Sequence, residues 1–269
     1  MAYRFLETYR DGPIAHVAIN RPEVRNAFNE HVIAELTAWC EALAADPGVR
    51  CAIIGGAGPV FCAGADLAWM SKMVAYTHEQ NVADANAAAH MYAALDRLPI
   101  PLIGRVHGAA LGGGAGLAAV CDVVVAEDGA IFGFTEVKVG IIPAMISPYV
   151  MAKIGQSATR HLFVTGARFS AQHAKDIGLV HSVVAVEDLD TQIAQYAREL
   201  LSCGPEAIAT VKGLLREVAQ RSPGDAVGIT AEAIAGRRVS AEGQEGMKAF
   251  LEKRKAAWNV SPDPDRQSR

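Results

Sequence analysis

The sequence predicts an α/β core followed by a C-terminal region made of helices alone. Short apolar runs alternate with helical segments through most of the chain, and from about Asp188 onward only amphipathic helices remain. Alternation of this kind is typical of largely parallel sheets whose strands are buried on both faces. We therefore divide the chain into a core of residues 1–200 and a helical region of residues 201–269.

The first elements follow from apolar spacing and capping residues. Residues 3–8 and 14–19 are β-rich runs, and residues 51–55 form a glycine-bounded apolar run that predicts a buried strand. Between them Asn29 predicts the N-cap of a helix. The apolar residues of that helix recur on one face: Val32, Leu36, Cys40 and Leu43.

The same rhythm continues in the middle of the chain. Residues 80–98 predict an alanine-rich helix that ends before two prolines, and residues 102–106 predict a strand. Residues 111–120 open with three glycines and predict a buried helix, and residues 123–126 predict another strand.

Four amphipathic helices are predicted from Asp188 onward, over residues 188–201, 205–220, 223–238 and 240–255. Such a helical region has little core of its own, so we expect it to pack against the core or against another subunit.

Composition excludes several classes of protein. Hydrophobic residues make up 51% of the chain and the formal net charge is −4, which argues against a protein that neutralises nucleic-acid phosphates. No apolar leader or membrane-length apolar run occurs, so we expect a cytoplasmic protein that does not enter a membrane. The five cysteines form no paired motif, which predicts no disulfide framework and no metal site.

Two segments concentrate glycine at junctions between a predicted strand and a predicted helix. They are residues 55–66 and residues 108–116. Neither contains a nucleotide P-loop, and the second lies too late in the chain for a dinucleotide fingerprint. Each junction presents free N–H groups, so two of them converging on one oxygen would form an oxyanion hole. Taken singly, each glycine-rich segment could be no more than a tight turn.

Five segments form a combined pattern in a fixed order. They are Asn20-Arg21-Pro22 with Asn26-Ala27, residues 61–66, residues 107–116 with Cys121-Asp122, Phe132-Gly133 with residues 136–143, and residues 166–180. In this order and spacing they resemble the crotonase (enoyl-CoA hydratase/isomerase) family over nearly the whole chain. The resemblance implies a spiral of ββα units with a C-terminal helical trimerisation region. It also implies an acyl-CoA substrate with no further cofactor, and a homotrimer or a dimer of trimers.

The resemblance also implies roles for individual residues. The oxyanion N–H groups would come from Ala65 and Gly113, and Glu136 would be the base. Arg25 would contact a CoA phosphate, and the backbone around Ala63 would face the adenine. Further substrate or CoA contacts would come from Ala27, Asp66, Leu67, Gly112 and Gly116. Phe250 and Lys253 would reach the CoA of a neighbouring subunit, although Lys253 could equally belong to a solvated helix face.

The chemistry fits these assignments. Moving a proton beside a thioester carbonyl passes through an enolate, which two N–H donors stabilise. Glu136 follows an apolar stretch that should desolvate it and raise its pKa toward a range useful for acid–base work. A glutamate met outside this pattern could instead be an ordinary surface residue.

One position departs from the family's two-carboxylate hydratases. They carry a second glutamate where this chain has Gly116, and a single base suits an isomerase. Residues 61–70, 134–137 and 142–150, however, resemble bacterial methylglutaconyl-CoA and carboxygeranoyl-CoA hydratases of leucine and acyclic-terpene breakdown, which also have glycine there. We therefore predict a hydratase of a branched, carboxylated 2-enoyl-CoA such as methylglutaconyl-CoA.

Two other functions remain open at this point. One is an enoyl-CoA delta-isomerase that uses Glu136 as its single base, and the other is a non-catalytic acyl-CoA-binding or scaffold protein. Lys72 or Arg105 could meet a substrate carboxylate, but nothing in the sequence singles either out.

Overall fold

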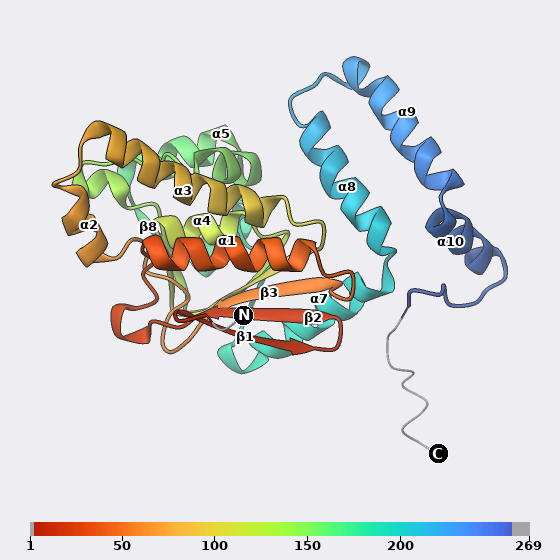
Figure 1. The fold of residues 1–269 in the computed structure, drawn as a ribbon, viewed down its shortest axis with the longest axis horizontal. Helices are drawn as coiled ribbons and strands as arrows, with labels where there is room; N and C mark the ends of the chain where they lie inside the picture. Colours follow the sequence, from red (N-terminus) through yellow and green to blue (C-terminus); the bar gives the residue numbers. More distant parts are fainter. Residues whose placement is uncertain (1–2, 260–269) are drawn as a thin grey trace.

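The computed structural model describes residues 3–259 and contains a large sheet, a small sheet and a helical arm (Figure 1). The large sheet has the order β1 (Leu6–Asp11), β2 (Ile14–Ile19), β3 (Cys51–Gly56), β4 (Leu102–Val106), β6 (Val123–Glu127) and β9 (Ser182–Val184). The pair β1–β2 is antiparallel and every other neighbouring pair is parallel. The predicted α/β class and its largely parallel sheet are confirmed.

Helices cover both faces of the large sheet, and the strand sequences show why. Because side chains alternate across a strand, Ala52 and Ile54 of β3 join the main core beneath α1 (Glu30–Ala44) and α3 (His78–Asp96). Cys51 and Ile53 point the other way and pack with α7 (Leu189–Ser202). A strand that is apolar on both faces requires this double cover.

The first strand lies later in the chain than predicted. It pairs with β2 from Leu6 opposite Ile19 to Asp11 opposite Ile14, so the two-residue turn after Asp11 determines where it begins. The N–H groups of Arg4 and Phe5 instead donate to the carboxylate of Glu35 on α1, each at 2.9 Å. The prediction of a strand over residues 3–8 was therefore wrong for its first half.

The glycine-opened segment after β4 divides into two elements. β5 (Ala109–Leu111) precedes α4 (Gly113–Ala119), which is buried as predicted. With β7 (Ile131–Gly133) and β8 (Arg168–Ser170), β5 builds the small sheet in the order β5-β7-β8. The remaining helices of the core are α2 (Leu67–Met73), α5 (Ser147–Thr165) and α6 (Ala171–Asp176), with 3-10 helices at Pro22–Val24, Glu136–Val139 and Val186–Asp188.

The C-terminal arm consists of α8 (Pro205–Val218), α9 (Pro223–Val239) and α10 (Ala241–Leu251), and it extends away from the core in Figure 1. One attachment to the core is Lys212, whose ammonium donates to Asp122 Oδ2 at 2.6 Å and to the Ile100 carbonyl at 3.0 Å. The division predicted at residue 200 falls in the last turn of α7, and residues 260–269 of the predicted region lie outside the described residues.

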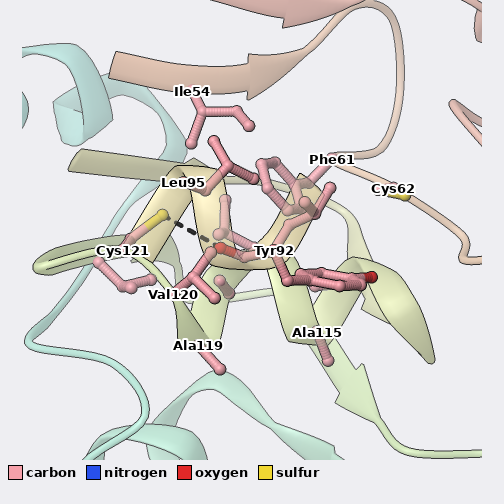
Figure 2. Close-up of a cluster of buried hydrophobic side chains, with 14 of the residues drawn as sticks. Ile54, Phe61, Cys62, Tyr92, Leu95, Ala115, Ala119, Val120 and Cys121 are labelled. Atoms are coloured by element: carbon pink, nitrogen blue, oxygen red, sulfur yellow. Dashed lines mark hydrogen bonds between the residues drawn. The ribbon is translucent and has the colours of Figure 1, made fainter. Parts of the chain in front are cut away.

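The centre of the core is the hydrocarbon cluster in Figure 2, where Phe61, Leu95 and Ala115 surround the ring of Tyr92. Among residues 3–259, no helix has the length and apolar character needed to cross a bilayer.

Asn26 connects two backbone segments beside this core. Its buried side chain accepts from the Arg21 N–H at 2.9 Å and donates to the carbonyls of Ala57 and Val60 at 2.6 and 2.7 Å. A buried polar group that loses its partner costs about 1–3 kcal/mol. This amide thus helps to hold the loop that precedes α1 against the first glycine-rich segment, together with the backbone bond from Ala63 N–H to the Arg25 carbonyl.

We expect Asn26→Ala to lower the free energy of unfolding by about 3 kcal/mol, because it leaves several buried backbone groups unpaired. Denaturant titration measures this value. Gln172→Ala is the matched control, since Gln172 donates from an exposed position to Asp176 and its loss should cost under about 0.5 kcal/mol. Equal losses for the two variants would contradict a special role for Asn26.

Candidate active site

The two glycine-rich segments lie directly against each other. Cys62 and Ala110 form a parallel bridge, in which Cys62 N–H donates to the Ala109 carbonyl and Leu111 N–H donates to the Cys62 carbonyl, both at 3.0 Å. Gly64 has φ +96°, and a Cβ added there would meet the Leu111 carbonyl oxygen at 2.8 Å. Glycine is required at this contact, and it brings the two junctions together as their composition predicts.

Two backbone donors are left free where the segments meet. Phe28 N–H donates to the Gly64 carbonyl, and Asp66 N–H donates to the Phe28 carbonyl. The N–H of Ala65, which lies between these two residues, takes no part in this pairing. Gly113 is the first residue of α4, whose opening N–H groups have no partner within the helix. Among residues 3–259, neither Ala65 N–H nor Gly113 N–H donates to an acceptor, and both residues line one cavity.

Glu136 reaches the same cavity from the end of the small sheet. Gly112 N–H donates to the Gly133 carbonyl at 2.7 Å, which fixes the chain just before Glu136 beside α4. Gly112 has φ +53°, and a Cβ there would lie 3.2 Å from Glu136 Oε1. Glu136 Oε2 is buried with no hydrogen-bond partner among the described residues, and burial raises the pKa of this carboxyl.

The cavity has a volume of about 350 Å³ and mostly apolar walls. The first glycine-rich segment, α2, α3 and the turn before α5 supply most of its lining. The larger side chains in its lining include Phe28, Trp69, Tyr92, Glu136, Met145 and Ile146. Apolar walls lower the local dielectric and so strengthen the hydrogen bonds made against them.

A second hollow, of about 700 Å³, opens next to the first. The two share Ala63, Ala65 and Leu67, so a ligand can run continuously from one into the other. The groove also contains Arg25 and Ala27, and its exposed Arg25 could meet a phosphate. These are positions where the sequence predicted CoA contacts.

Asp66 lies in the groove but is already engaged. Its carboxylate caps α2 by accepting from Ala68 and Trp69 N–H, and it forms a 2.8 Å ion pair with Arg21. Because both charged groups are largely buried, this pair holds the loop of Arg21 to the oxyanion segment.

Three predicted site residues lie outside both hollows. Gly116 is buried in α4 behind Ile146, and a Cβ added to it would meet Ile146 Cγ2 at 2.2 Å. Ile146, not Gly116, therefore forms the cavity wall at this point. Phe250 and Lys253 lie at the end of the C-terminal arm, away from the hollows of their own chain, so their predicted contact with a neighbouring subunit stays a prediction.

Several cavity residues had no signal in the sequence. Tyr92, Asn81 and Asp84 come from one face of α3, an alanine-rich helix without a motif. Helical spacing alone could have placed them together, but nothing indicated that their face borders a site. Asp84 accepts from Trp69 Nε1 at 3.1 Å, and burial raises the pKa of its carboxyl.

The two cationic side chains that could have met a substrate carboxylate form ion pairs outside the cavity. Lys72 pairs with Glu30 at 2.6 Å and Arg105 pairs with Asp190 at 2.6 Å. Neither of them lines the cavity.

Comparison with known proteins places this site in a family. A family model described as enoyl-CoA hydratase/isomerase matches residues 10–261. The chain belongs to the enoyl-CoA hydratase/isomerase family. It is 34% identical to the crotonyl-CoA hydratase of Syntrophomonas wolfei over 258 residues, which cover 95% of this chain and 98% of that protein.

Solved structures of enoyl-CoA hydratases share the fold of this family member. One from Shewanella pealeana superposes with a TM-score of 0.91 at 39% identity, covering 95% of this chain and 96% of that one. One from Mycobacterium smegmatis gives a TM-score of 0.90 at 31% identity, covering 96% and 100%. The predicted crotonase-like spiral is confirmed.

The raised pKa of Glu136 yields a prediction about stability. Between the ordinary value of 4.5 and the raised value, the folded protein binds more protons than the unfolded chain, so the free energy of unfolding falls as pH rises through that window. We expect Glu136→Gln to raise the Tm near neutral pH and to have little effect below pH 4.5. Thermal melts across this range measure it, and an equal effect at every pH would show that Glu136 is not destabilised by its charge.

The packing of Gly116 yields a second prediction. Gly116→Glu should lower the free energy of unfolding by roughly 3 kcal/mol, because it overpacks the core and buries a carboxylate. Adding Ile146→Ala should recover part of this loss, since Ile146 Cγ2 is the closest atom to the new side chain. Denaturant titrations of both single variants and the double variant measure the coupling, and strictly additive losses would contradict this packing.

Proposed function

We propose that this protein is an enoyl-CoA hydratase, which adds water across the double bond of a 2-enoyl-CoA. The observation that carries the proposal is the convergence of two free N–H groups, from Ala65 and Gly113, with the unpartnered Oε2 of Glu136 in one cavity. Donors for an oxyanion beside a desolvated base are what this chemistry requires. The likeness to a crotonyl-CoA hydratase supports the same activity.

The proposed reaction uses each of these groups. The thioester oxygen accepts hydrogen bonds from Ala65 and Gly113, so electron density from the double bond can move onto it when water attacks the β-carbon. Glu136 removes a proton from the water and returns a proton to the α-carbon, which leaves it a carboxylate again. Loss of one oxyanion donor typically costs about 3 kcal/mol of barrier.

The CoA portion is proposed to occupy the neighbouring groove. Its phosphates would approach Arg25, and its pantetheine arm would pass Ala63 and Leu67, which border both hollows. The acyl-CoA is the substrate itself, and the proposed reaction uses no further cofactor.

The acyl cavity favours an uncharged enoyl group. Glu136 and Asp84 are the charged side chains among its described lining residues, and that lining includes no Lys, Arg or His. A carboxylated acyl group such as methylglutaconyl would meet like charge, which opposes binding. We therefore place uncharged 2-enoyl-CoA ahead of methylglutaconyl-CoA, the substrate that the subfamily resemblance favours. A cation from a neighbouring subunit would reverse this order.

Isomerisation is the second candidate function, and the absence of a second carboxylate at Gly116 favours it. A single base can carry a proton between two carbons of one substrate. A scaffold without chemistry is less favoured, because a binding protein has no need for a buried, unpartnered carboxylate beside two free N–H groups.

The proposed assembly is a homotrimer or a dimer of trimers. The C-terminal arm exposes a series of large apolar side chains, which a subunit interface would cover. They are Val211, Leu215, Val227, Ile234, Val239, Met247, Phe250 and Leu251.

The proposed function predicts that the purified protein hydrates crotonyl-CoA faster than methylglutaconyl-CoA, and that Glu136→Gln lowers kcat at least about a hundredfold by removing the acid–base group. Loss of the conjugated enone absorbance follows both reactions. No loss with either substrate, together with formation of the enone from a 3-enoyl-CoA, would establish the isomerase. Faster turnover of methylglutaconyl-CoA would instead favour the carboxylated acyl-CoA as the substrate.

A further inference from the structure

Asp84 brings a carboxylate to the end of the acyl cavity where α2 lies beside α3 (Figure 1). Its Oδ1 accepts from the indole N–H of Trp69 at 3.1 Å, and the Trp69 side chain is itself buried. Asp84 is half-buried, and no donor among residues 3–259 reaches its Oδ2. One carboxylate oxygen is thus anchored, while the other is left for whatever occupies the cavity.

Two aromatic rings separate Asp84 from the oxyanion donors. A Cβ added to Gly113 would clash with the ring of Phe28, so that ring packs directly against the oxyanion residue. The ring centroids of Phe28 and Trp69 are 6.1 Å apart, and Trp69 in turn bonds to Asp84. An acyl chain whose thioester is held by the oxyanion donors can therefore meet Asp84 with its far end.

No positive charge offsets Asp84 within the cavity. The described lining contains no Lys, Arg or His. Burial raises the pKa of the Asp84 carboxyl, and so does the negative charge of Glu30. Lys72 pairs with Glu30 at 2.6 Å, which weakens that repulsion without bringing a cation into the lining. A second carboxylate at this end would meet like charge with nothing to neutralise it.

The neutral polar side chains at this end offer no donor either. Asn81 donates both of its amide hydrogens to backbone carbonyls, of Tyr76 at 3.4 Å and of Thr77 at 3.1 Å. It can present only its Oδ1 acceptor to the cavity. The indole N–H of Trp69 is used by Asp84. An ionised carboxylate only accepts hydrogen bonds, so it would find no partner among these side chains.

We propose that Asp84 is the specificity-determining residue that excludes acyl groups ending in a carboxylate, so that the acyl-CoA bound at this site ends in an apolar group. This inference rests on the proposed function, because it names the substrate class of that same site. The exclusion acts through like-charge repulsion and through the missing donor, and both disfavour the bound form of a carboxylated acyl-CoA. Asp84 takes no part in the proton transfers, which belong to Glu136.

The test compares two saturated ligands that differ only at the last carbon of the acyl chain. Valeryl-CoA ends in a methyl group and glutaryl-CoA in a carboxylate, and neither has a double bond to hydrate. Calorimetric titration measures both dissociation constants. We expect the wild-type protein to bind valeryl-CoA about thirtyfold more tightly, since opposed like charges cost several kcal/mol. We expect Asp84→Asn, which keeps an acceptor for Trp69, to lower this ratio about tenfold.

Glu79→Gln is the matched control. Glu79 lies in the first turn of α3, is exposed and does not line the cavity. Its substitution changes the net charge by the same one unit, so it should leave the ratio of the two dissociation constants unchanged. A general effect of protein charge on the anionic CoA changes both ligands alike and cancels in that ratio. Thermal melts check that each variant is folded.

Three outcomes would overturn the inference. They are equal affinity of the wild-type protein for the two ligands, an unchanged ratio in Asp84→Asn, and a ratio that falls in Glu136→Gln but not in Asp84→Asn. The last would assign the selection to the base. The proposed function is checked separately, by hydration of crotonyl-CoA. A protein that selects valeryl-CoA but hydrates nothing would overturn the hydratase and leave the selectivity of the site in place.

Discussion

The backbone contact between the two glycine-rich segments is the constraint on which the active site depends. The pairing of Cys62 with Ala110 satisfies most polar groups of these segments but leaves the N–H groups of Ala65 and Gly113 unpaired. Ala65 and Gly113 are half-buried and border the cavity, so their N–H groups can meet one ligand oxygen only while the two segments are held in place. Asn26 and the ion pair between Arg21 and Asp66 help to supply that restraint.

The pKa of Glu136 depends on the same enclosure. Burial desolvates its carboxyl and raises that pKa, and no cation among the described cavity residues offsets this. Desolvation makes the carboxylate a stronger base and also makes its charged form unfavourable in the folded state. The burial that suits Glu136 to proton transfer therefore lowers the stability of the folded protein at neutral pH.

Local patterns in the sequence predicted the elements whose cause is local. The strands over residues 14–19 and 102–106 agree with β2 and β4, and the Asn29 cap of α1 is present, because apolar alternation and capping act within a few residues. The prediction of a strand over residues 3–8 was wrong for its first half, because the N–H groups of Arg4 and Phe5 donate to the carboxylate of Glu35, about thirty residues later in the chain. The places of Tyr92 and Ile146 in the cavity wall could not be predicted from the sequence, because they depend on contacts with α4 that no short sequence pattern indicates.

The packing behind α4 explains how the site can lack a second carboxylate. Gly116 lets Ile146 and the ring of Tyr92 approach the helix closely, so the volume that a glutamate would need is filled with hydrocarbon. This filling keeps one negative charge beside the oxyanion peptide instead of two, and two close carboxylates would raise each other's pKa. Glu136 can therefore act without a second carboxylate close enough to shift its pKa.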